Sequence, residues 1–182
     1  MEFLSTIKSK STILHEIILV LGGVILLFAA SQVEIFLKPV PITLQTVAVM
    51  LIGLTYTPRR AVVSHLMWIG LGAMGWPVFC GFSAGAKVLV GPTAGYITGF
   101  VVSTYCMATL KEKLALNSWV YDLLLCLMGT GIVFTLGVLW LSVLIGFSNG
   151  VIHGVLPFIL PGIVKAGLLC TGLQILRYYR QG

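Results

Sequence analysis

Long apolar runs follow one another along this chain, and few charged residues lie between them. Only 9% of the 182 residues are charged, against about 25% in an ordinary soluble domain. A soluble globule needs a charged surface and a disordered chain has a low apolar content, so both classes are excluded. The pattern predicts an all-α integral membrane protein embedded in a lipid bilayer.

Six of the apolar runs qualify as transmembrane helices. A spanning helix takes roughly 20 apolar residues, so six helices use about 120 residues and leave only short loops. We therefore expect a single transmembrane domain over residues 1–182. A signal peptide is the competing interpretation of the first run, and the further spans disfavour it. The predicted runs are residues 17–37, 42–57, 61–75, 93–110, 119–147 and a sixth from Pro157 or Pro161 to just before Arg177.

The segment between the third and fourth runs differs from the others. It reads WPVFCGFSAGAKVLVGP, residues 76–92, and is rich in glycine with a proline near each end. Such a composition disfavours a continuous helix, and irregular backbone at membrane depth must be enclosed by protein or line a cavity. We expect a structured outer loop here that acts as a lid.

The basic residues divide unequally between the two sides of a six-helix arrangement. Eight fall on the side of the termini and three on the other, which by the positive-inside rule places both termini in the cytoplasm. The net charge of +6 is explained by this bias, and no nucleic-acid partner is expected. The eight are Lys8, Lys10, Arg59, Arg60, Lys111, Lys113, Arg177 and Arg180, and the three are Lys38, Lys87 and Lys165.

No motif for catalysis, metal binding or nucleotide binding is found. The stretch GFSAGAK, residues 81–87, lacks the Ser or Thr that follows the lysine of a phosphate-binding loop, so the chain is not expected to hydrolyse ATP. The three histidines and four cysteines lack metal-ligand or paired spacing. Ser64 beside His65 does not form the glycine-rich elbow of a hydrolase. We therefore expect no cofactor and no enzymatic activity.

Small residues and unusual lysines mark two further features. Gly91, Gly95 and Gly99 recur every fourth residue and share one helix face, which favours close helix packing.

Lys165 lies inside the sixth apolar run, where a lysine costs about 3 kcal/mol on insertion scales. It either extends to the outer interface or lines a cavity as a functional cation.

Three segments, in their order and spacing, resemble the BioY family of biotin-capturing S subunits of energy-coupling-factor (ECF) transporters. They are PVPITLQTVAVMLIGLTYTPRRA at 39–61, GWPVFCGFSAGAKVLVGPTAGYITGF at 75–100 and PFILPGIVKA at 157–166. The resemblance implies six helices, an outward-opening pocket for biotin and uptake across the cytoplasmic membrane. It also implies an energising partner module with a transmembrane coupling subunit and two ATPases.

The resemblance also directs attention to particular pocket residues. Lys165 is expected to meet the ligand carboxylate, with Lys87 as a second donor, and Phe79 and Phe82 to cover the apolar rings and chain. The full predicted ligand-binding set is Gln45, Phe79, Phe82, Ser83, Lys87, Tyr96 and Lys165.

One position departs from the family pattern. Members usually carry an Asp three residues before the lysine of the sixth helix, and this chain has Gly162 there. The ureido N–H groups of biotin then need another acceptor, for which Gln45, Ser83, Glu34 and backbone carbonyls are the candidates.

Other functions stay open at this level. An S subunit for a different vitamin would share the fold, and a membrane assembly subunit would bind no small ligand. An intramembrane enzyme would need a second catalytic group facing Lys87 or Lys165, and the sequence offers none. A binding assay across several vitamins separates these functions.

Overall fold

The computed structural model describes the backbone of residues 2–181 and the side chains of residues 13–180. Lys8 and Lys10, counted above for the cytoplasmic side, lie outside the described side chains. The elements in chain order are α1 (Glu2–Gln32), β1 (Glu34–Ile35), β2 (Ile42–Thr43), α2 (Gln45–Thr55), α3 (Pro58–Ala73), the 3-10 turn η1 (Cys80–Phe82), α4 (Ala86–Val90), α5 (Ala94–Leu114), α6 (Trp119–Ile145), α7 (Phe147–Gly154) and α8 (Leu156–Gln181).

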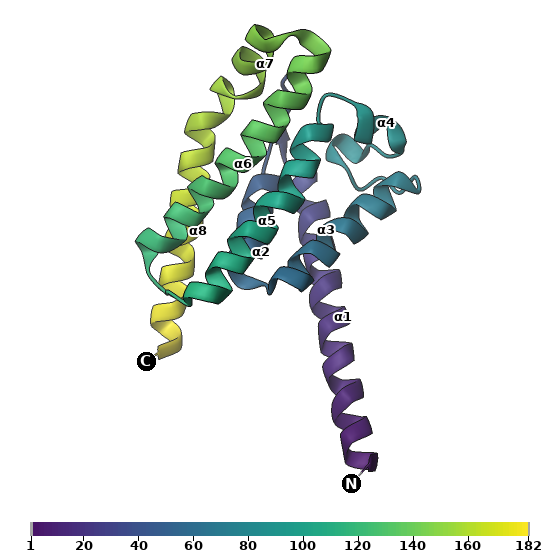
Figure 1. Ribbon diagram of the computed structural model, residues 1–182, viewed down its shortest axis with the longest axis vertical. Helices are drawn as coiled ribbons and strands as arrows, with labels where there is room; N and C mark the ends of the chain where they lie inside the picture. The colour runs from purple at the N-terminus through teal and green to yellow at the C-terminus, as the bar shows by residue number, and fades with distance from the viewer. Residues whose placement is uncertain (1, 182) are drawn as a thin grey trace.

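The long helices form an elongated bundle with two distinct ends (Figure 1). The start of α1 and the end of α8 lie at one end, called here the terminus end. The short helices α4 and α7 lie at the opposite end, called here the pocket end. Three stretches are long and apolar enough to cross a membrane, namely Ile13–Gln32, Trp119–Ile145 and Phe147–Arg180, and Gln45–Thr55 is a shorter apolar helix. The all-α membrane class is therefore confirmed.

The structure differs from the predicted apolar runs at two places near the pocket end, after α1 and after α6. The first helix ends at Gln32, and residues 33–44 form a hairpin in which Glu34 pairs with Thr43. Most of residues 148–156, predicted as a connection, belongs to α7, which begins at Phe147 and is separated from α6 by Gly146 at φ +85°. Only glycine adopts this conformation without strain, so the chain bends there and then resumes a helix.

The glycines of α5 allow it to pack closely on α6. A Cβ added at Gly95 would lie 2.5 Å from the carbonyl oxygen of Leu136, and one at Gly99 would lie 2.9 Å from the Cα of Val133. The predicted small-residue face is thus confirmed for these two positions. Gly91 is not part of it, because it caps α4 and precedes the start of α5.

Ion pairs join helices toward the terminus end. The Asp122 carboxylate at the start of α6 contacts Lys111 of α5 at 2.7 Å and Arg177 of α8 at 2.5 Å. Glu16 of α1 pairs with Arg60 of α3. These ion pairs link α6 to α5 and α8, and α1 to α3, and so they stabilise the bundle away from the cavity.

Candidate binding site

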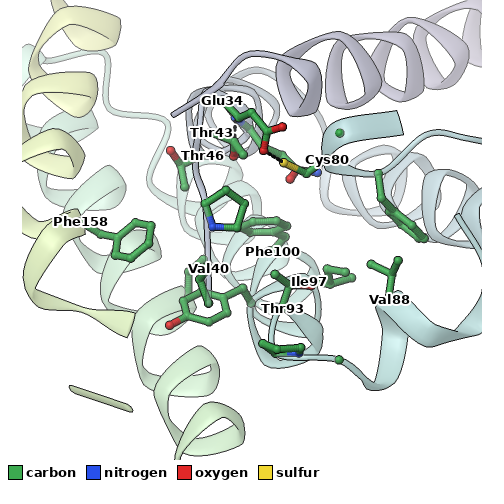
Figure 2. Close-up of a pocket in the computed structure, with 18 of the residues that line it drawn as sticks. Glu34, Val40, Thr43, Thr46, Cys80, Val88, Thr93, Ile97, Phe100 and Phe158 are labelled. Carbon is green, nitrogen blue, oxygen red and sulfur yellow. Dashed lines mark hydrogen bonds between the residues drawn. The ribbon is translucent and has the colours of Figure 1, made fainter. Parts of the chain in front are cut away.

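A cavity of about 520 Å³ opens at the pocket end of the bundle. Its walls come from the hairpin, η1, α4, the first turns of α2, α5 and α8, the middle of α6 and one residue of α3, as Figure 2 shows in part. The volume lies within the range of small-molecule sites, about 300–1,000 Å³. Seven aromatic side chains line it: Phe36, Trp68, Phe79, Tyr96, Phe100, Phe134 and Phe158.

The wall formed by Trp68 and Phe79 is rigidly built. The two rings meet edge to face with centroids 4.9 Å apart, and Trp68 Nε1 donates to the Val78 carbonyl at 3.0 Å. A Cβ at Gly72 would lie 2.1 Å from Phe79, so glycine at this position is what lets the ring enter. Phe79 thus lines the cavity together with Trp68; Trp68 was not predicted, because its partner is met only in the folded chain.

Lys165 reaches the cavity from α8 and is held there by neutral groups. Its Nζ donates to the Thr43 carbonyl at 2.6 Å and to Thr46 Oγ1 at 3.3 Å. None of the ion pairs among the described side chains involves Lys165. The cavity wall thus holds a half-buried ammonium group without a carboxylate partner, which is the electrostatic arrangement that an anionic ligand group complements.

Gln45 contributes a second polar group with unused capacity. The residue lies in the first turn of α2, is 5% exposed and lines the cavity. Its Nε2 makes no hydrogen bond, although a buried amide donor without a partner is costly. A ligand acceptor in the cavity removes that cost.

Tyr96 lines the cavity with its ring, while its hydroxyl is already engaged. The hydroxyl donates to the Gly154 carbonyl at 2.7 Å and so ties α5 to α7. A Cβ at Gly137 would lie 2.4 Å from the ring and one at Gly154 2.4 Å from the hydroxyl oxygen. The ring is therefore available for apolar contact, and the phenol proton is used within the protein.

Two of the other predicted loop residues line the cavity and one does not. Ser83 and Lys87 are lining residues, and the Ser83 hydroxyl donates to the Cys80 carbonyl. Phe82 lies outside the lining, 63% exposed, with its ring edge to face against Phe28 at 6.3 Å. Positive φ at Gly81 and Phe82 turns the backbone, and the Phe82 ring lies against α1 and not on the cavity wall where the sequence predicted it.

The first half of the predicted lid is fastened to the end of α1. Ser31 Oγ donates to the Val78 carbonyl and Gln32 Nε2 to the Phe79 carbonyl, both at 3.0 Å. Gln32 Oε1 accepts the Phe82 N–H at 3.0 Å. In Figure 2 the Cys80 thiol meets the Glu34 carboxylate of the hairpin. Ser31, Gln32 and Glu34 were readable as the only polar interruptions near the end of the first apolar run.

The described residues contain no cluster of three or more His, Cys, Asp or Glu side chains suited to a metal ion. His65 is wholly buried, with Nδ1 at 2.9 Å from the Ala61 carbonyl and Nε2 at 3.3 Å from Thr104 Oγ1. It thus acts as a polar link between α3 and α5.

Known proteins resemble this chain over nearly all of its length. Residues 5–181 match the BioY family. The "Probable biotin transporter BioY" of Rickettsia prowazekii is 38% identical over 90% of this chain and 82% of its own. The protein of the same name in Pyrococcus horikoshii is 40% identical over 83% and 89%. The crystal structure of the S-component for biotin from an ECF-type ABC transporter superposes with a TM-score of 0.77 and 26% identity, covering 94% and 93%.

Proposed function

The chain belongs to the BioY family, and from this premise we propose that it captures biotin at the outer face of the cell membrane and carries it across. The observation that carries the proposal is the cavity, which combines an aromatic wall with one half-buried ammonium group. Biotin has apolar rings and an apolar chain that suit the wall, and a carboxylate that suits Lys165. The site supplies binding groups only, so we propose no chemical step.

We propose that six of the predicted or lining groups contact biotin. Lys165 meets the carboxylate, with Lys87 of α4 as a second, more exposed donor. Gln45 donates to a ligand acceptor, Phe79 and the Tyr96 ring pack on apolar atoms, and Ser83 contributes at the rim. Their common support is that all six line one cavity.

The partner in this proposal is an ATP-driven module, with a coupling transmembrane subunit and two ATPases. The support is the ECF-type transporter to which the structurally similar S-component belongs, together with the incomplete phosphate-loop pattern at residues 81–87. We expect uptake of labelled biotin into proteoliposomes to rise strongly when the module and ATP are added. Equal uptake by the chain alone contradicts this partnership, and tighter binding of another vitamin in a competition panel contradicts the choice of biotin.

For the membrane arrangement we propose six crossings, by α1, α2, α3, α5, α6 and α8, with the terminus end in the cytoplasm. The support is the excess of Lys and Arg near that end and the common position of the two chain ends in Figure 1. At 11 residues, α2 is about 16 Å long, shorter than the roughly 30 Å hydrocarbon core. The hairpin, packed against protein, completes this crossing.

This topology predicts opposite labelling at the two ends. In a variant without the four native cysteines, Cys introduced at residue 181 should not react with an impermeant maleimide in intact cells. Cys introduced at the exposed hairpin residue Lys38 should react. Labelling at residue 181 before the cells are lysed contradicts the proposed orientation.

A further inference from the structure

The Glu34 carboxylate lines the cavity. Among the lining residues of the described chain it is the one carboxylate, beside the two cations Lys87 and Lys165. None of the ion pairs found among the described side chains includes it. A partly buried carboxylate that lacks a cation depends on hydrogen-bond donors to offset its lost hydration.

One oxygen of this carboxylate has a donor and the other is open. Oε2 accepts the Cys80 S–H, as the dashed line in Figure 2 shows. No described donor reaches Oε1, which would lie 3.3 Å from a Cβ at residue 81. Because residue 81 is glycine, at φ +63°, no side chain covers Oε1 from that side.

The thiol is suited to a fixed donor role. Burial, and then the adjacent Glu34 carboxylate, raise the pKa of Cys80 to about 12. The thiol therefore stays protonated at neutral pH and donates to Oε2. The backbone on both sides of Cys80 is fastened to α1 by Ser31 and Gln32, so the carboxylate is held in one orientation.

From this geometry we infer that Glu34, positioned by Cys80, is the acceptor for the N–H groups of the bound ligand and thereby selects a ureido-bearing ligand. The inference rests on the proposed function and assigns a residue to the ligand's donor groups. Gly162 does not provide an acid, whereas Glu34 does so from the hairpin. Thr43, the strand partner of Glu34, accepts from Lys165 through its carbonyl. The acidic and basic groups thus flank the same hairpin strand pair, which suits a ligand with donors on its ring and a carboxylate on its chain.

The test combines a protein change with a ligand change. Calorimetry with purified protein compares wild type, Glu34→Gln and Lys38→Gln, a matched control that removes one charge from the same hairpin outside the lining. The ligands are biotin and biotin methylated on both ureido nitrogens. Hydrogen bonds to charged groups contribute about 1.5–3 kcal/mol, so Glu34→Gln should weaken biotin binding roughly 10- to 100-fold. Lys38→Gln should leave it within about threefold.

Methylation removes the two N–H donors of biotin and also adds bulk. Comparing both ligands in both wild type and Glu34→Gln separates the two effects. Wild type should lose far more affinity on methylation than Glu34→Gln does, because the variant has already lost the charged acceptor. Equal losses in the two proteins, or unchanged biotin binding by Glu34→Gln, overturn the inference while leaving biotin capture intact. Failure of wild type to bind biotin overturns both.

The positioning role of Cys80 has its own readout. Cys80→Ser keeps a donor to Oε2 and should bind biotin within about threefold of wild type, whereas Cys80→Ala should approach the affinity of Glu34→Gln. The Ala variant should also lose the discrimination between biotin and its methylated form. If Ser and Ala behave alike, Cys80 does not position the carboxylate.

Discussion

Lys165→Ala is expected to weaken biotin binding by about 3 kcal/mol, roughly two decades in Kd. A carboxylate that enters a mainly apolar cavity is costly unless a cation meets it, and Lys165 is the half-buried ammonium in the wall. The value lies at the low end for breaking a buried pair, because Lys165 already donates to Thr43 and Thr46. Isothermal titration of the purified protein measures the loss.

Two controls show whether the lost affinity comes from charge. Lys87→Ala should have a smaller effect, since Lys87 is exposed on α4, and Lys38→Ala should have almost none. Biotin amide, which lacks the charge, should bind wild type less well than biotin does but bind Lys165→Ala about as well as biotin. If Lys165→Ala binds biotin as tightly as wild type, Lys165 does not meet the biotin carboxylate and acts as an interfacial anchor.

Lys165 was predictable because its signal lies within one segment. A lysine inside an apolar run is costly in the membrane, so its position singled it out as either an interfacial anchor or a cavity cation. The glycines Gly95 and Gly99 carry a similarly local signal, since a four-residue spacing identifies a helix face. The helical class follows from such patterns and the structure agrees with it, and the structure also contains a cavity that Lys165 lines.

Features that depend on contacts between distant segments were not predictable in this way. Phe79 and Phe82 lie three residues apart in one loop, but their rings point to different places. Gly72 leaves the space that the Phe79 ring fills, whereas positive φ at Gly81 turns the chain before Phe82. The sequence offers no means to rank the two rings before the loop is folded. The hydrogen bond between Cys80 and Glu34 likewise joins residues 46 positions apart, so the carboxylate could be suggested as an acceptor but not placed.

A cluster of three charged side chains, Asp122, Lys111 and Arg177, stabilises the packing of helices near the terminus end. In the sequence these residues lie far apart. Asp122 has a side chain 1% exposed, while Lys111 and Arg177 are 13% and 25% exposed. The Lys111 ammonium also donates to the Leu116 carbonyl at the turn into α6. One buried carboxylate thus compensates two cations on neighbouring helices, and its removal leaves both charges partly buried without a partner.

Asp122→Ala is therefore expected to destabilise the protein by about 3 kcal/mol, seen as a lower midpoint of thermal unfolding in detergent. Glu112→Ala, the matched removal of an exposed acid on α5, should change the midpoint little. Biotin affinity of the folded Asp122 variant should stay within about threefold of wild type, because the cluster lies apart from the cavity lining.

A compensating variant shows whether the loss comes from uncompensated charge. Replacing a whole buried ion cluster by apolar residues of similar size is often neutral or stabilising, whereas removing one partner is costly. The triple variant Asp122→Leu, Lys111→Met and Arg177→Met should therefore recover most of the lost midpoint. If the triple variant is no more stable than Asp122→Ala, packing around Asp122 accounts for the loss, and the charge argument for this end of the bundle is wrong.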